Sequence, residues 1–175
     1  MDVQQLIRLH EEGTPPKYLF FWGHRTPGPG YLSQWWPSPF TVDGVTYATA
    51  EHYMMAEKAR LFSDEETAAA VVAAPHPGAA KDLGRRVRGF DDDVWTAQRT
   101  SIVVAGNRAK FTQNAELRDY LAATRSRVLV EASPLDRVWG IGLAADDPRA
   151  ANPAEWQGGN LLGFALMTVR DSLTA

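Results

Sequence analysis

The stretch "TYATAEHYMMAEKARLF", residues 46–62, predicts the central helix of the fold. Thr49 is of the residue type that caps helix N-termini. Glu51 would then place a carboxylate in the first turn, where the helix dipole favours negative charge. The same stretch carries charged residues among methionines and aromatic residues, so it can be either an ordinary amphipathic helix or a helix whose buried face carries chemistry.

A helical wheel at 100° per residue separates these interpretations only in part. Five residues share one face: Glu51, Met54, Met55, Lys58 and Phe62. Glu51 and Lys58 lie seven residues apart, about 10.5 Å along the axis. Burying an unpaired charge is costly, so the two charges can sit at the edge of the core and pair with neighbours. Alternatively the helix lines an apolar pocket in which the pKa values of both groups are shifted.

A metal site is not expected. His52 and Glu57 fall outside the face of Glu51 and Lys58, and the four histidines do not have metal-binding spacing. Cysteine is absent, which excludes disulfides, thiolate ligands and cysteine nucleophiles. We therefore predict neither a metal nor a cofactor.

The rest of the chain predicts further helices and a few short strands. Strands are expected over 17–24, 127–132 and 137–143, with a β-hairpin around Asp43-Gly44. Helices are expected after an N-cap at Ser63, from Pro77, from 91–93 to Phe111, after Asn114, and over 161–173. Parallel βαβ repetition is missing. We predict an α+β, helix-dominated single domain over 1–175, with a core over 18–173 and a helix and connector over 1–17.

Composition and charge limit the class of protein. The 175 residues carry a net charge of −3 and a pI of about 5.8, so any nucleic-acid contact must be local. The N-terminus lacks a signal-peptide pattern, and no apolar run is long enough to span a bilayer. We expect a soluble cytoplasmic protein without membrane contact, and the sequence does not indicate its oligomeric state.

Two later segments add candidate binding groups. "LVEASPLDRVWGIGL", residues 129–143, brings Asp136, Trp139 and the backbone of Gly140 and Gly142 together. A turn role for Asp136 and a β-bulge at the glycines explain the pattern equally well. In "WQGGNLLGFAL", residues 156–166, Asn160 precedes a helix N-terminus, which suits either an anion site or a routine cap.

Tryptophans and arginines complete the set of candidates. Six tryptophans, at 22, 35, 36, 95, 139 and 156, can stack a flat ligand or pin loops to the core. Arginines at 85, 86, 88, 99 and 108 can hold phosphate. Carboxylates, a helical lysine, indoles and arginines together suit hydrolysis of a ribosyl or phosphoribosyl compound.

Taken together, the segments resemble the NADAR superfamily, also called YbiA-like, over about residues 18–173. The resembling stretches are "YLSQWWPSPFTVDGVTYATAEHYMMAEKARLF", "GRRVRGF", "VWTAQRTSIVVAGNRAKFTQNAELRDYL", "LVEASPLDRVWGIGL" and "WQGGNLLGFALMTVR". The resemblance implies an α+β, mostly helical domain that cleaves an N-glycosidic bond to ribose. It also implies that the acid of the "EHY" motif is Glu51, that the helical lysine is Lys58, and that the acid and indole of "SPxDxxWGIG" are Asp136 and Trp139.

The resemblance and the residue patterns together give the expected substrate-binding residues. Trp95 matches an indole associated with the family's site. The chain has "SQWWPSPF", with Trp36, where many relatives have "SNFYPSPF", and "FFWGH" before it. These departures fall at the wall that would stack the base. We expect substrate contacts from Trp36, Arg85, Trp95, Arg99, Trp139, Gly140, Gly142 and Asn160.

Three functional hypotheses remain open. The leading one is removal of ADP-ribose from guanine bases of nucleic acid, with a local single-stranded contact at a basic patch of Lys81, Arg85, Arg86 and Arg88. Glu51 and Asp136 would do acid–base work, and Lys58 would be a Schiff-base nucleophile or an electrostatic aid. The alternatives are an N-glycosidase acting on ribosylamino-pyrimidine phosphates of riboflavin synthesis, and a non-catalytic module that binds ADP-ribose or a nucleotide.

Overall fold

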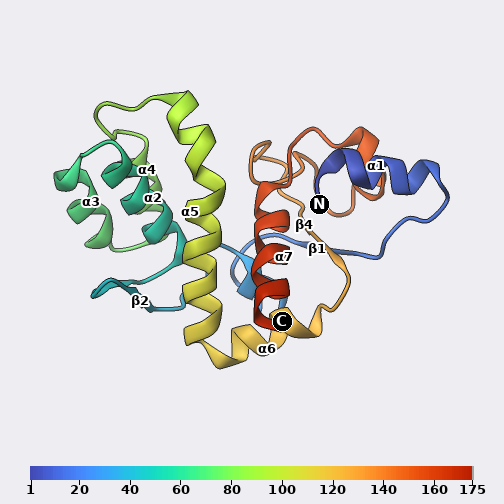
Figure 1. The fold of residues 1–175 in the computed structure, drawn as a ribbon, viewed down its shortest axis with the longest axis horizontal. Coiled ribbons are helices and arrows are strands. Elements are labelled where there is room, and N and C mark those ends of the chain that lie inside the picture. The colour runs from blue at the N-terminus through green and yellow to red at the C-terminus, as the bar shows by residue number, and fades with distance from the viewer. Residues whose placement is uncertain (175) are drawn as a thin grey trace. The chain divides into compact units, whose positions relative to one another are not determined.

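The computed structural model describes residues 1–174 and groups the chain into two compact units, coloured along the chain in Figure 1. The helical unit comprises residues 34–118, and the strand-pair unit comprises residues 1–33 together with the chain from 119 onward. Within residues 1–174 there are seven α-helices, three short 3-10 helices and four short strands. The predicted α+β, helix-dominated class is confirmed, whereas a single domain over 1–175 stays a prediction.

The helical unit is built around one helix. Its elements are β2 (Phe40–Val42), β3 (Val45–Tyr47), α2 (Ala50–Leu61), α3 (Glu65–Val72), α4 (Pro77–Gly84) and α5 (Asp92–Gln113). Helix α2 packs against α3, α4 and α5 (Figure 1). Its residues 50–56 are all buried. Its N-cap is Thr49, as predicted, because the Thr49 hydroxyl accepts a hydrogen bond from the His52 backbone N–H.

Two glycines allow neighbouring helices to approach α2 closely. A Cβ at Gly84 of α4 would lie 2.1 Å from Sδ of Met55, and a Cβ at Gly106 of α5 would lie 2.4 Å from Cδ1 of Tyr53. Both distances are far inside van der Waals contact, so a side chain at either position would push a helix away from α2.

The chain enters α2 through the predicted hairpin, in which β2 and β3 pair antiparallel with Phe40 opposite Tyr47. Asp43 and Gly44 have φ angles of 49° and 78°, the positive values that a type I′ turn requires. This prediction from the Asp-Gly pair is confirmed.

The start of the next helix was predicted one residue too early. Ser63 is not the N-cap of α3; it has a φ of 57°, and Asp64 caps the helix by accepting from the Thr67 backbone N–H. The buried Asp64 carboxylate also accepts from the backbone N–H and the guanidinium of Arg88, at 2.9 and 2.5 Å. A carboxylate has the acceptor sites to serve both segments, which a serine hydroxyl does not.

The strand-pair unit has a parallel pair of strands at its centre. Strand β1 (Tyr18–Phe21) pairs with β4 (Val128–Glu131), with Tyr18 opposite Val128. Its other elements are α1 (Val3–Glu11), η1 (Pro29–Leu32), η2 (Pro148–Ala151), η3 (Pro153–Glu155) and α7 (Leu161–Thr174). Helix α7 packs along β4, while α6 (Ala115–Ala123) spans the boundary between the units (Figure 1).

The strand predicted over 137–143 is wrong, because these residues form an irregular loop. Oδ1 of Asp136 accepts from the backbone N–H groups of Val138 and Trp139, each at 2.8 Å. Gly142 has a φ of 70°, and its N–H donates to the Asp136 carbonyl at 3.1 Å. The N–H groups of Val138, Trp139 and Gly142 are thus used within the turn and are not available to pair with a neighbouring strand.

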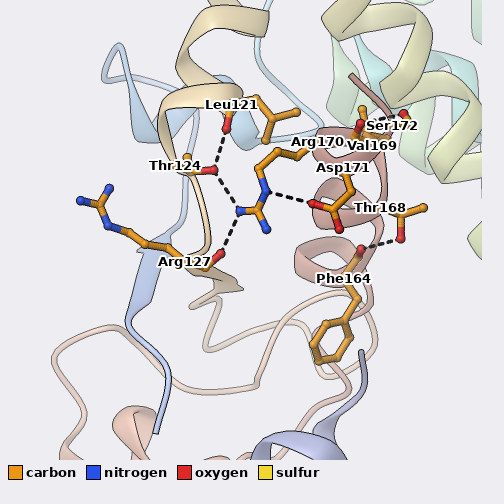
Figure 2. Close-up of polar contacts among 9 residues, drawn as sticks. All are labelled: Leu121, Thr124, Arg127, Phe164, Thr168, Val169, Arg170, Asp171 and Ser172. Carbon is orange, nitrogen blue, oxygen red and sulfur yellow. Dashed lines mark hydrogen bonds and ion pairs between the residues drawn. The ribbon is translucent and has the colours of Figure 1, made fainter. Parts of the chain in front are cut away.

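A buried arginine holds the end of α7 to the connector that precedes β4 (Figure 2). Nη1 of Arg170 donates to Oγ1 of Thr124 at 3.1 Å and to the Arg127 carbonyl at 2.8 Å. Its Nε lies 3.4 Å from Oδ1 of Asp171. Because Arg170 is only 5% exposed, these bonds act in a weakly hydrated setting and fix α7 to the connector before β4.

Candidate functional site

The predicted site residues fall into two groups, one in each unit. The helical unit holds Trp36, Glu51, Lys58, Arg85, Trp95 and Arg99, and the strand-pair unit holds Asp136, Trp139, Gly140, Gly142 and Asn160. Each group has its own local geometry.

The Lys58 amine on α2 lies among aromatic rings. Its Nζ is 4.3 Å from the ring centroid of Phe90 and 5.5 Å from that of Trp95. Burial lowers the pKa of the half-buried amine, an effect that the nearby Asp92 carboxylate opposes. Within residues 1–174, no carboxylate forms an ion pair with Lys58. A larger fraction of this amine is therefore neutral and nucleophilic than in an exposed lysine.

The Glu51 carboxylate lies two turns earlier on the same helix. The residue is only 3% exposed, and its backbone N–H donates to the Gln34 carbonyl at 3.0 Å. Met54 and Met55, which the wheel places on the same face, are also buried. Lys58 is half-buried among rings, and no described residue forms an ion pair with it. The interpretation of α2 as a pocket-lining helix stays a prediction.

Helix α5 contributes two further predicted residues. Trp95 is buried beside Lys58, and Arg99 follows it one turn later. Nε of Arg99 is buried and has no hydrogen-bond partner among the described residues. A buried guanidinium N–H in this state is a donor that a ligand can satisfy.

The two remaining predicted residues of this unit are less distinctive. Arg85 is exposed and forms an ion pair with Asp82 at 2.9 Å. Trp36 is half-buried in the segment before β2, where the Ser38 hydroxyl donates to its carbonyl.

Sequence reasoning missed Phe90, whose ring makes the closest aromatic contact with Lys58. Phe90 is 44% exposed and packs edge-on against Phe62, with ring centroids 5.4 Å apart. The only local signal was an aromatic residue between Gly89 and the acidic start of α5. Nothing in that pattern points to the lysine 32 positions earlier in the chain.

His52 is a structural residue. Its ring nitrogens lie 2.8 Å from the Thr49 hydroxyl and 3.0 Å from the Ala74 carbonyl, and the residue is buried. Both nitrogens are thus engaged with the protein. No group of three histidine, aspartate or glutamate side chains within the described part of the chain is arranged to hold a metal ion.

In the strand-pair unit, the loop with Asp136 is held together by its own hydrogen bonds. Oδ1 of Asp136 is used by the turn described above, and the Gly142 N–H is used by the Asp136 carbonyl. The Gly140 carbonyl accepts from the Asn160 backbone N–H at 3.1 Å. Asp136 is thus a turn former, and half-buried Trp139 follows directly from that turn. Oδ2 is the Asp136 oxygen that remains for chemistry.

Asn160 joins the start of α7 to strand β4. Its amide nitrogen donates to the Leu129 carbonyl at 2.9 Å, and its amide oxygen accepts from the Glu131 N–H at 3.0 Å. The side chain is fully buried, so its polar atoms are committed to the backbone of β4. Direct contact of Asn160 with substrate stays a prediction. The observed hydrogen bonds show that Asn160 holds the start of α7 against β4.

These residues lie within a stretch that a known family model matches. The model of the NADAR domain covers residues 20–174. The chain belongs to the NADAR family. It is 41% identical over 162 residues to N-glycosidase R617 of Acanthamoeba polyphaga mimivirus, covering 89% of this chain and 95% of that protein. It is 34% identical over 135 residues to N-glycosidase YbiA of Escherichia coli strain K12, covering 77% and 76% of the two chains.

A solved structure agrees with the family assignment. The NMR structure of the E. coli protein YbiA superimposes with a TM-score of 0.75 at 30% identity, covering 91% of this chain and 86% of that one. A third relative, N-glycosidase Npun_R5314 of Nostoc punctiforme, is 34% identical over 145 residues. The expected enzyme class, a hydrolase of N-glycosyl bonds, is confirmed by these relatives. No helix within residues 1–174 has the length and apolar character needed to cross a bilayer.

Proposed function

We propose that this NADAR-family N-glycosidase removes ADP-ribose from guanine bases by cleaving the bond between ribose C1 and the exocyclic nitrogen. The observation that carries the proposal is the half-buried Lys58 amine, whose pKa is lowered by burial between the rings of Phe90 and Trp95. Hydrolysis of an ordinary O-glycoside by two carboxylates needs no such amine. Cleavage of a glycosylamine can use one, because its C1 can open to an iminium.

The proposed chemistry begins with opening of the ribose ring, in which the ring oxygen gains a proton and C1 forms an iminium with the base nitrogen. The neutral Lys58 amine attacks C1 and gives up one proton, while the base nitrogen gains one proton and leaves. A carboxyl group, for which Glu51 is the candidate, donates the proton to the base nitrogen and takes back the one from the lysine nitrogen. The resulting Schiff base between Lys58 and C1 is then hydrolysed by water. This step releases the aldehyde form of the ribose, which closes again to the ring.

Other residues of the helical unit suit the remaining parts of such a substrate. The Trp95 indole offers an apolar surface beside the amine, and the buried Nε of Arg99 offers an N–H for a phosphate or hydroxyl oxygen. Asp136 and Trp139 keep the roles that the family resemblance gives them, in acid–base work and in binding, as predictions.

The alternative substrate class, ribosylamino-pyrimidine phosphates, is supported by the charges of the predicted basic patch. Arg85 pairs with Asp82, and Arg88 pairs with Asp64 and Glu66. These carboxylates offset the positive charge with which the patch would attract a polynucleotide. A small phosphorylated substrate needs no such patch, so it is the second candidate.

Borohydride trapping tests the proposed role of the lysine. An oligonucleotide bearing ADP-ribosylated guanine is incubated with the enzyme and borohydride, and adducts are mapped by peptide mass spectrometry. We expect a reduced adduct on Lys58 in the native enzyme and a loss of turnover of about 10²-fold or more in Lys58→Arg, because arginine keeps the charge but is not a nucleophile. Native-like turnover in Lys58→Arg without an adduct would remove the covalent role.

A further inference from the structure

We propose that Phe90 is a positioning residue for Lys58, whose ring holds the Nζ amine in place and covers it from water. The contact is specific: Nζ lies 4.3 Å from the Phe90 ring centroid, closer than the 5.5 Å to Trp95. Phe90 is itself held by the edge-on contact with Phe62, the C-cap residue of α2. The Phe90 ring is therefore supported by the C-terminal end of α2, the helix that carries Lys58.

The ring acts on the amine in two opposite ways. The negative face of an aromatic ring attracts an ammonium group, which favours the charged form. The same ring excludes water from the amine, which favours the neutral form. Burial is the largest influence on this amine, and it lowers the pKa. We take the cover by Phe90 to be the stronger of its two effects, because its ring lies nearest to Nζ.

The surroundings of the amine are simple enough to separate these effects. Asp92 at the start of α5 is the charged group that acts on Lys58, and it favours the ammonium form. Phe62, Phe90 and Trp95 carry no charge, so substitution of Phe90 changes the cover and the ring attraction without adding or removing a titrating group. Phe90→Leu retains an apolar cover but removes the ring face, whereas Phe90→Ala removes both.

The inference predicts opposite shifts in the two variants. In Phe90→Leu, loss of the ring attraction should lower the midpoint of Lys58 titration and raise the neutral fraction at pH 7–8 about two- to fivefold. In Phe90→Ala, access of water should raise the midpoint and lower the neutral fraction about threefold or more. Phe90→Tyr retains the ring and the cover, so its midpoint should stay at the native value.

Competitive labelling with acetic anhydride measures this directly on the full chain. The rate of acetylation of Lys58 is followed by peptide mass spectrometry from pH 6 to pH 11, with exposed Lys17 as the internal reference. Val94→Ala is the matched control, because Val94 is 43% exposed, close to the 44% of Phe90. We expect no shift in the control, since Val94 lies four residues later, at the start of α5, and has no aromatic ring.

The labelling of the Phe90 variants has two kinds of outcome. Opposite shifts in Phe90→Leu and Phe90→Ala, with Phe90→Tyr unchanged, support the positioning role. Shifts in the same direction, or no shift in either variant, overturn it. The inference rests on the proposed function only for its consequence in turnover. The labelling uses no substrate, so a native enzyme that fails to cleave the ADP-ribosyl bond would contradict the proposed function and leave the labelling result intact.

Discussion

Replacement of Asn160 by alanine should destabilise the strand-pair unit severely. The Asn160 amide supplies the partners for the Leu129 carbonyl and the Glu131 N–H, at 2.9 and 3.0 Å. Leaving a buried backbone group without a partner costs about 1–3 kcal/mol. Asn160 also has a φ of 50°, a conformation that costs alanine about 1 kcal/mol more than asparagine or glycine. For the two backbone groups and the φ angle together the cost is about 3–7 kcal/mol, a large part of the ordinary stability of a domain.

Two further variants separate the hydrogen bonds from the backbone conformation. Asn160→Gly removes the bonds but tolerates the φ angle, so it should be about 1 kcal/mol more stable than Asn160→Ala. Asn160→Asp keeps an acceptor for the Glu131 N–H but turns a carboxylate oxygen towards the Leu129 carbonyl. This repulsion raises the pKa of the new carboxyl in the folded state, so the loss of stability should shrink as the pH falls and the group becomes protonated.

Urea unfolding followed by circular dichroism measures these differences as changes in the free energy of unfolding. The reasoning is refuted if Asn160→Ala lies within about 1 kcal/mol of the native protein. That result would mean that water replaces the amide without loss, and that Asn160 does not hold α7 to β4. A second contradiction would be an equal cost for the alanine and glycine variants, because the φ angle would then contribute nothing.

Two other predictions follow from single side chains. Asp136→Asn keeps the oxygen that accepts from Val138 and Trp139, so it should cost less than about 1 kcal/mol in urea unfolding, while Asp136→Ala should cost about 1–2 kcal/mol. If the Asp136 carboxylate does acid–base work, Asp136→Asn should still lower kcat at least about 10²-fold, and native kcat would reduce the residue to a turn former. Lys110 is fully buried, and burial lowers its pKa from 10.5 to about 7. Between these two pH values the unfolded chain binds one proton more than the folded chain. The free energy of unfolding should therefore rise from pH 7 towards pH 10 by about 3–5 kcal/mol. Lys110→Gln should lose this slope, and a slope equal to that of the native protein would refute the assignment. The comparison should stay below pH 10, because burial raises the pKa of Tyr18 and Tyr53 to about 12 and their ionisation in the unfolded chain lowers stability above that pH.

The sequence predicts elements whose signals are local. The Asp43-Gly44 turn and the Thr49 cap each depend on residues within one turn, and both are found where expected. The prediction of a strand over 137–143 is wrong because alternating apolar residues are equally compatible with a loop in which the Val138, Trp139 and Gly142 N–H groups donate to Asp136. The prediction of Ser63 as the N-cap of α3 is wrong for a related reason. Asp64 caps the helix while it also accepts from the backbone N–H of Arg88, which is distant in the chain.

For the candidate site too, the sequence predicts only what a single element carries. The helical wheel could place Glu51 and Lys58 on one face of α2, because both belong to one helix. It could not find the Phe90 contact, which depends on how the segment between α4 and α5 folds back to α2. It also could not show that the Asn160 amide is committed to β4, a pairing across about 30 residues of sequence. Chemistry carried by one element is thus predictable from the sequence, whereas contacts between elements need the fold.

The substrate of the enzyme is decided by comparing kcat/KM on two substrates side by side. One is an oligonucleotide with ADP-ribosylated guanine, and the other is a ribosylamino-pyrimidine phosphate, each followed by release of the ribose product. We predict a kcat/KM at least about 10²-fold higher for the ADP-ribosyl-guanine substrate, with the activity lost in Lys58→Arg. A preference for the ribosylamino-pyrimidine phosphate would contradict the proposed substrate, and release of product from neither would contradict the proposed function as a whole.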